Sequence, residues 1–360
     1  MVRTTHTGTR IRGSPQAPDA TNPVEPVNGT GHKRISVPKG HEKENEMRTI
    51  AEKKFGGPIA LMDLPTPEIG AAEVLVRVRA AGVNPFDWKV ADGELKDDLE
   101  HRFPLILGFD AAGVVERVGA NVTELAEGDE VYGYLFKPAI GGGAYAEYVT
   151  APAAIVAKKP ASVRFTEAAA LPMPGLTAMA LVDAVDPKEG ETVLIVEATG
   201  GVGSYAIQLA TRRGARVIAT ARQANEAFAR ELGATETVDH TRRDLLNAVR
   251  MTHPRGIDAI IDVVSERDVL SRIAGLLKDG GRLASSVYAA DVESLAQRGI
   301  KATNVGVHPD ARQLEELSRM VDAGELTVRL ERTLPLERAP EALDESRTGH
   351  VRGKIVLLVD

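Results

Sequence analysis

A glycine-rich segment in the middle of the chain has the composition of a phosphate-binding turn. It follows the apolar run 192–196 and contains Thr199, Gly200, Gly201, Val202 and Gly203. Glycine lets the backbone approach a pyrophosphate closely, and the N-terminus of a helix that starts there attracts negative charge. Ala198 takes the place of the first glycine of the dinucleotide fingerprint. Because the segment joins an apolar strand to a helix within a strand–helix series, it predicts dinucleotide binding.

The next strand, residues 217–220, distinguishes between the two nicotinamide cofactors. An NAD site usually carries Asp or Glu near the end of this strand, where the acid binds the ribose 2′-hydroxyl. Residues 216–225 contain no acid, and Arg222 stands just beyond the strand. A guanidinium suits a 2′-phosphate, although a solvated surface arginine is the alternative interpretation. The pattern favours NADP(H), with Arg222 and His240 as contacts to the 2′-phosphate or the ribose.

The overall composition excludes several classes of function. The chain has no cysteine, which excludes disulfides, thiolate nucleophiles, Cys-ligated zinc and iron–sulfur clusters. Its net charge of −7 does not indicate a broad basic face for nucleic acid. The histidines lack metal-site spacing, no apolar run reaches the ~18 residues of a membrane span, and no secretory signal is apparent. We therefore expect a cytoplasmic protein that binds no metal, nucleic acid or membrane.

Two kinds of pattern position the candidate residues. Residues 176–309 alternate short apolar strands with helices, which is typical of a Rossmann domain with a doubly wound parallel sheet. Residues 47–175 contain short strands rich in Val and Tyr, separated by Gly and Pro, as in a small β-barrel. Residues 310–360, with a strand at 326–333, are expected to complete this first domain and to place the active site in the cleft. Residues 1–46 have few apolar side chains and are expected to be disordered.

The chain resembles a known enzyme family in several stretches that keep their order. They are residues 82–89 (GVNPFDWK), 104–119 (PLILGFDAAGVVERVG), 127–133 (EGDEVYG), 142–149 (GGAYAEYV), 168–172 (AAALP), 175–178 (GLTA), 198–203 (ATGGVG) and 349–356 (GHVRGKIV). These stretches are similar to the medium-chain dehydrogenase/reductase superfamily, in particular its zinc-independent quinone oxidoreductase and enone reductase branch. The resemblance implies an α/β protein with a GroES-like β-barrel catalytic domain and a Rossmann domain, assembled as a homodimer.

The resemblance also implies chemistry without zinc. Zinc alcohol dehydrogenases of this superfamily carry Cys where this sequence has Asn84 and His where it has Phe109. An amide and a phenyl ring cannot replace a thiolate and an imidazole on zinc. The remaining chemistry is hydride transfer from NADPH to a quinone or an α,β-unsaturated carbonyl, whose developing charge needs hydrogen-bond donors. By position, Asn84 and Lys89 are the candidate catalytic residues. A turn cap before Pro85 and a solvated loop charge are the alternative interpretations.

By position, the resemblance implies further cofactor contacts at the ends of the fourth and fifth strands of the Rossmann domain. They are Val264, Ser285, Ser286 and Val287, where open parallel sheets bind ligands. Arg352 and Lys354 are instead expected to lie in a solvated turn. Two other functions remain open, namely a non-catalytic, crystallin-like NADPH-binding protein and an alcohol dehydrogenase. The sequence does not distinguish quinone from enone substrates.

Overall fold

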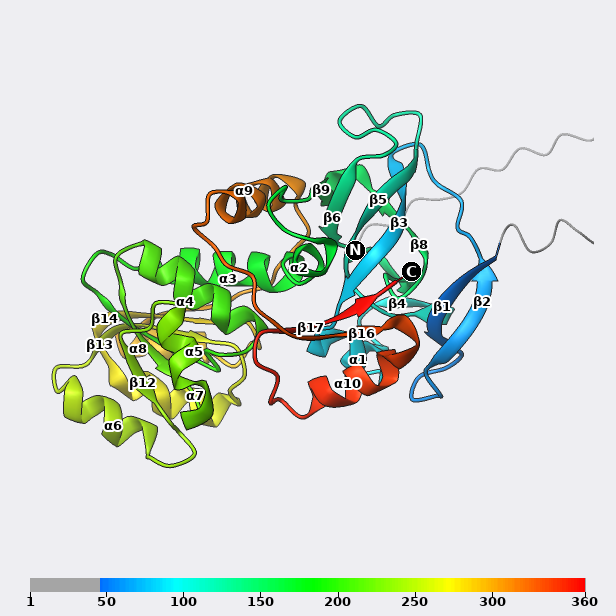
Figure 1. Cartoon of the computed structure of the whole chain (residues 1–360). Coiled ribbons are helices and arrows are strands. Elements are labelled where there is room, and N and C mark those ends of the chain that lie inside the picture. The colour runs from blue at the N-terminus through cyan, green and yellow to red at the C-terminus, as the bar shows by residue number, and fades with distance from the viewer. Residues whose placement is uncertain (1–45, 360) are drawn as a thin grey trace, which may run out of the picture. The chain divides into compact units, whose positions relative to one another are not determined.

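The computed structural model describes residues 46–359, which contain one six-stranded, one seven-stranded and one four-stranded sheet (Figure 1). The disorder expected for residues 1–46 lies outside the described residues, except that Glu46 already begins a strand. Within residues 46–359, no helix is long and apolar enough to cross a membrane.

The six-stranded sheet is parallel and has the order β12-β11-β10-β13-β14-β15. Its strands are β10 (Thr192–Val196), β11 (Arg216–Thr220), β12 (Glu236–Val238), β13 (Ile257–Asp262), β14 (Leu277–Ser285) and β15 (Lys301–Asn304). Along β10, Val193 and Ile195 belong to one hydrophobic cluster, whereas Leu194 and Val196 belong to another. Both faces of the sheet are therefore buried, since successive side chains of a strand point to opposite faces.

The strand order predicts a ligand-binding crevice at the carboxyl ends of β10 and β13. From β10 the chain first adds β11 and β12 on one side, and then β13, β14 and β15 on the other. Such a reversal leaves a crevice between the two central strands of a doubly wound sheet. The helices of this part are α3 (Pro172–Val185), α4 (Gly201–Arg212), α5 (Glu226–Glu231), α6 (Leu245–Thr252), α7 (Arg267–Ile273) and α8 (Val292–Gln297), with η3 (Gln223–Asn225) and η4 (Ala274–Leu276).

The other two sheets combine strands from both ends of the chain. The seven-stranded sheet contains β3 (Glu73–Gly82), β5 (Asp110–Val118), β6 (Glu130–Tyr134), β8 (Tyr148–Pro152), β9 (Val156–Lys158), β16 (Leu330–Pro335) and β17 (Lys354–Leu358). The four-stranded sheet contains β1 (Glu46–Glu52), β2 (Ala60–Pro65), β4 (Glu100–Ile106) and β7 (Ala139–Gly142). Because β17 pairs antiparallel with β3, the C-terminal segment lies beside residues 80–82 (Figure 1).

One predicted strand of the C-terminal segment starts later than the sequence suggests. The apolar pattern predicts a strand at residues 326–333, but β16 begins at Leu330. The backbone N–H of Thr327 donates to the side-chain oxygen of Gln208 on α4, at 2.8 Å. This N–H is therefore bound to a side chain far away in the sequence, and it is not available for a hydrogen bond to a neighbouring strand.

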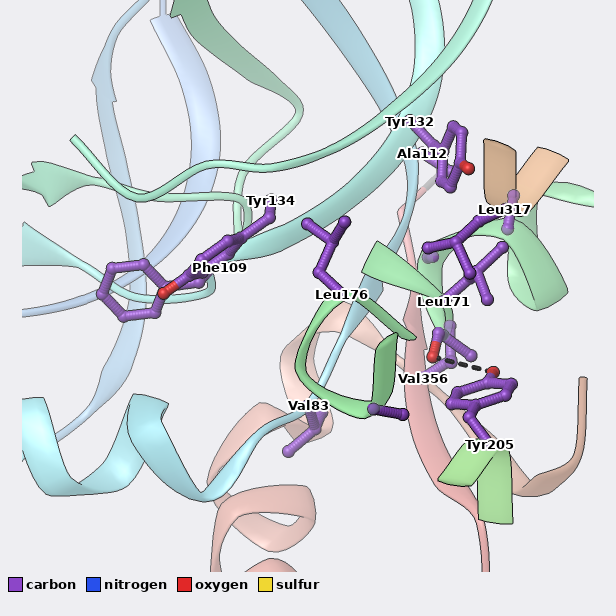
Figure 2. Packing of buried hydrophobic residues seen from close by; sticks show 14 of the residues in the cluster. Val83, Phe109, Ala112, Tyr132, Tyr134, Leu171, Leu176, Tyr205, Leu317 and Val356 are labelled. Atoms are coloured by element: carbon purple, nitrogen blue, oxygen red, sulfur yellow. Dashed lines mark hydrogen bonds between the residues drawn. The ribbon is translucent and has the colours of Figure 1, made fainter. Parts of the chain in front are cut away.

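A single hydrophobic cluster contains residues of both large sheets. It includes Val76 of β3, Ile195 of β10 and Leu317 of α9 (Ala311–Asp322). Tyr205 of α4 donates its hydroxyl to the carbonyl oxygen of Ala170, beside Leu171, at 3.2 Å (Figure 2). The remaining helices around this cluster are α1 (Pro85–Ala91), α2 (Phe165–Ala169), α9 (Ala311–Asp322) and α10 (Ala339–Arg347), with η2 (Ala153–Ile155) and η5 (Leu336–Arg338). The shared core holds the end of β10 close to the loop that follows β3.

Candidate active site

The turn between β10 and α4 has the geometry of a phosphate cradle. Gly200 is the N-cap of α4, so the first N–H groups of this helix lack carbonyl partners within the helix. A Cβ atom on Gly203 would lie 2.2 Å from the carbonyl oxygen of Glu197, which only glycine avoids. A Cβ atom on Gly200 would instead make only ordinary van der Waals contact, with Oε1 of Glu197 as its nearest neighbour at 3.5 Å. These features fit the pyrophosphate of a dinucleotide.

A pocket, called here the inner pocket, joins this cradle to the loop before α1. Its lining includes Gly200–Gly203 from the cradle, Val83–Pro85 from the loop, and Gly353–Ile355 from the start of β17. The backbone N–H of Gly353 donates to the carbonyl oxygen of Thr199 at 2.9 Å. The C-terminal segment therefore bridges the cradle and the loop that carries Asn84.

Asn84 is buried beside this pocket, with its amide group fixed by two side chains. Its Nδ2 donates to Oδ2 of Asp110 at 2.9 Å. Its Oδ1 accepts from Nζ of Lys354 at 2.5 Å, and the same ammonium donates to the carbonyl oxygen of Val83 at 2.5 Å. Because an ammonium group only donates, the amide oxygen must face Lys354 and the NH₂ group must face Asp110. One N–H of the amide is left over from these bonds.

Two buried carboxyl groups belong to the same cluster. Asp87 accepts the backbone N–H of Asn84 at 2.7 Å and the hydroxyl of Tyr145 at 2.8 Å. Burial raises the pKa of Asp87 to about 7 and that of Asp110 to about 6, since hydrogen bonds and Lys354 offset only part of the desolvation. Burial lowers the pKa of Lys354, against the attraction of both carboxylates. When one of the two carboxyl groups is protonated, the positive charge of Lys354 therefore neutralises the negative charge of the other.

Aromatic rings pack next to this cluster. Phe109 precedes Asp110 and is 5% exposed. Its ring lies edge-on to Phe86, with 4.8 Å between centroids, and 6.2 Å from the ring of Phe136. Among residues 46–359, no group of three or more His, Asp or Glu side chains could hold a metal ion. Apolar packing therefore fills the position at which the zinc enzymes carry a histidine.

Two domain families and several known proteins match the chain. The alcohol dehydrogenase GroES-like domain matches residues 70–161, and the zinc-binding dehydrogenase family matches residues 232–357. A chloroplast envelope quinone oxidoreductase homolog of Arabidopsis thaliana is 30% identical over 326 residues, which cover 86% of this chain and 98% of the relative. The chloroplastic NADPH-dependent alkenal/one oxidoreductase of the same plant is 30% identical over 333 residues, covering 89% and 80%.

The chain belongs to the medium-chain dehydrogenase/reductase superfamily. The quinone oxidoreductase of Coxiella burnetii is 34% identical, with a TM-score of 0.79 and coverage of 88% of this chain and 100% of that structure. A structure described as an NAD-dependent alcohol dehydrogenase is also 34% identical, with a TM-score of 0.79 and coverage of 87% and 100%. The expected GroES-like and Rossmann architecture of this superfamily is confirmed.

A second pocket, called here the outer pocket, continues the crevice of this dehydrogenase/reductase past β10. Its lining includes Thr220 at the end of β11, His240 beyond β12, and Arg272 on α7. Two residues, Glu197 and Val264, line both the outer and the inner pocket. The structure thus places His240 in the lining of the outer pocket and Val264 in both linings, and their contacts to a cofactor stay predictions.

The other predicted site residues do not line either pocket. Arg222 is exposed and caps η3, and its charge offsets part of the rise that burial causes in the pKa of Glu197. Lys89 lies on α1, with its Nζ 5.6 Å from the ring centroid of Trp88. Ser285 is buried, and its hydroxyl donates to Asp262 at 2.9 Å. Ser286 and Val287 follow the end of β14, and Thr199 contributes its carbonyl to Gly353. Their catalytic and cofactor-binding roles stay predictions.

The expectation that Lys354 lies in a solvated turn is wrong. This residue is 4% exposed and forms the centre of the Asn84 cluster, whereas Arg352 is exposed and pairs with Glu331 at 3.3 Å. Sequence reasoning also missed Glu197 as a pocket residue. In both cases a charged residue directly adjoins an apolar strand, residues 355–357 or 192–196. That juxtaposition does not by itself predict burial, because Arg216 adjoins the buried residues of β11 in the same way and is exposed.

Proposed function

We propose that this protein is an NADPH-dependent oxidoreductase that reduces quinones or α,β-unsaturated carbonyls without a metal ion. The observation that carries the proposal is the inner pocket, in which the glycine cradle and Asn84 line the same space. A cofactor held by the cradle therefore shares a pocket with a buried, oriented amide. The quinone and alkenal/one oxidoreductases among the relatives support this substrate class. NADPH, when bound, supplies a hydride from its nicotinamide ring.

The chain's own residues bind and orient the acceptor in this proposal. Asn84 offers its remaining Nδ2–H to the carbonyl oxygen of the acceptor, where negative charge develops as hydride arrives. Asp110 and Lys354 hold the amide in the donating orientation. Lys89 on α1 is the second candidate donor.

Further parts of the proposal concern the assembly of the protein. Residues 47–175 and 310–360 form the catalytic domain, and residues 176–309 form the NADP(H)-binding domain. The pairing of β17 with β3 supports this division. We propose that the protein works as a homodimer in the cytoplasm.

Steady-state turnover tests this function. The purified chain is expected to oxidise NADPH with 1,4-benzoquinone or with an α,β-unsaturated aldehyde such as 4-hydroxynonenal, at the same rate with and without a chelator. Loss of activity on chelation, with alcohol oxidation restored by zinc, would instead support the alcohol dehydrogenase, a class to which one solved relative is assigned. Tight NADPH binding without turnover of any acceptor would support the non-catalytic alternative.

Arg222→Asp is expected to reverse the cofactor preference. An acid beyond β11 repels the 2′-phosphate of NADPH and accepts the 2′-hydroxyl of NADH. The ratio of NADPH to NADH affinity should fall about tenfold or more, which corresponds to the loss of one charge-assisted contact. Fluorescence titration with each cofactor measures this ratio. Arg216→Asp, at the exposed opposite end of β11, is the matched control and should leave the ratio unchanged. An unchanged ratio in Arg222→Asp would remove Arg222 from the 2′-phosphate site.

A further inference from the structure

Glu197 occupies the neck between the two halves of the crevice. It directly follows β10 and, with Val264, is one of the two residues shared by the linings of the inner and outer pockets. Its Oε1 lies over the cradle, 3.5 Å from the position that a Cβ atom on Gly200 would take. An acidic side chain therefore stands where the crevice must accommodate the negatively charged backbone of a dinucleotide.

The backbone of Glu197 is held in an unfavourable conformation. Its φ angle is 57°, in the left-handed region of backbone conformation that residues other than glycine rarely adopt. Its N–H donates to the hydroxyl of Thr220 at 2.9 Å, which ties this peptide to the end of β11. Strained residues of this kind occur preferentially at ligand sites.

The carboxylate of Glu197 is half-buried and faces the pockets without a close partner. Within residues 46–359, no hydrogen bond or ion pair to it is found. Burial raises the pKa of this carboxyl group above its usual range. The cationic groups that offset part of this effect are Arg222 beyond β11, His240 beyond β12 and His350 in the C-terminal segment. Other charged groups around the pockets are Asp244, Glu266, Arg272 and Lys354.

We propose that ionised Glu197 opposes dinucleotide binding, so that the chain takes up a proton at this residue when the cofactor binds. This inference rests on the proposed function. A carboxylate and a pyrophosphate over the same glycine turn repel each other in a site of low dielectric constant. Protonation removes this repulsion, and the carboxylic acid becomes a donor to a phosphate oxygen. Glu197 therefore sets the affinity for both NADPH and NADH, whereas Arg222 sets only their ratio.

Cofactor titration of Glu197→Gln tests the inference. At about pH 8 the variant should bind NADPH and NADH each about tenfold more tightly than the unmodified chain. The affinity of the unmodified chain should decrease as pH rises through the raised pKa of Glu197, and this dependence should be weaker in the variant. Because all other groups are the same in both proteins, the difference between the unmodified chain and the variant is the relevant quantity. Calorimetry in buffers of different ionisation enthalpy should show less proton uptake for the variant.

Two further variants separate charge from backbone strain. Glu293→Gln makes the same change at an exposed residue of α8 that lines neither pocket, and should leave both Kd values unchanged. Glu197→Gly removes both the charge and the strain, so it should tighten binding and also raise Tm by a few degrees relative to Glu197→Gln.

The possible outcomes distinguish this inference from the proposed function. Equal affinities and equal proton uptake in the unmodified chain and Glu197→Gln would overturn it. Weaker binding by Glu197→Gln would also overturn it, since the carboxylate would then be an acceptor for a ribose hydroxyl. If neither protein bound NADPH, the proposed function itself would fail.

Discussion

Lys354→Met is expected to destabilise the folded chain by about 3–5 kcal/mol. The ammonium of Lys354 is the cation among the buried groups Asn84, Asp87 and Asp110, and it donates to Asn84 and Val83. Methionine fills the same space but leaves Oδ1 of Asn84 without this donor and Asp110 without the balancing charge. Urea unfolding of the complete chain at pH 7 measures the loss. The orientation of the Asn84 amide is lost as well, so kcat for quinone reduction should fall while the Kd for NADPH changes little.

The pH dependence of this loss identifies its cause. Without the ammonium, the pKa of Asp110 in the folded state rises further above its value in the unfolded chain. A carboxyl group with a raised folded pKa stabilises the fold at low pH, and this contribution disappears as pH rises. The deficit of Lys354→Met should therefore be smallest near pH 5 and largest near pH 8.

Two variants act as controls for Lys354→Met. The double change Lys354→Met with Asp110→Asn removes both charges and should recover a large part of the stability, since no unpaired charge stays buried. Arg352→Met, two residues earlier and exposed, should cost less than about 1 kcal/mol, because its pair with Glu331 is a surface ion pair. A loss in Lys354→Met no larger than that in Arg352→Met would contradict the role given to the buried ammonium.

The Rossmann half of the fold could be predicted because its signals are local. Four apolar residues in succession, Val193–Val196, make up most of β10, and the cradle glycines follow within a few positions. The predicted strands 192–196 and 217–220 end at the same residues as β10 and β11. Strand β16 was placed four residues too early because its N-terminal neighbour bonds to Gln208, which is 119 residues away.

The candidate site was predictable only in part, because its geometry depends on contacts between residues far apart in the sequence. Asn84 was placed in the cleft from its motif, and it does line the inner pocket. Its orientation depends on Asp110, 26 residues away, and on Lys354, 270 residues away. No local pattern reports contacts over such separations. The strain at Glu197 was hidden too, because a positive φ angle at a non-glycine residue is imposed by surrounding packing rather than by preference.

Gly203→Ala should damage both the fold and cofactor binding. The new Cβ atom would stand 2.2 Å from the carbonyl oxygen of Glu197 and 2.6 Å from Cα of Ala198. Both are backbone atoms at the end of β10, so the clash can be relieved only by moving α4 away from the sheet. Overpacking against backbone is expected to cost about 3 kcal/mol, measured by urea unfolding. Because the same movement displaces the helix N-terminus from the cradle, NADPH affinity should fall more than about tenfold.

Gly200→Ala is the matched comparison that separates the effect on folding from the effect on NADPH binding. A Cβ atom there would meet nothing closer than 3.5 Å, and the φ angle of Gly200 is −75°, which alanine adopts without strain. The cost in stability should therefore stay near 1 kcal/mol, the usual effect of alanine at an N-cap. The added methyl group nevertheless stands in the lining of the inner pocket, so NADPH should bind more weakly in a protein that is still folded. If Gly203→Ala instead unfolds at the same urea concentration as Gly200→Ala and binds NADPH as tightly as the unmodified chain, then close packing of α4 on β10 is not what shapes the cradle.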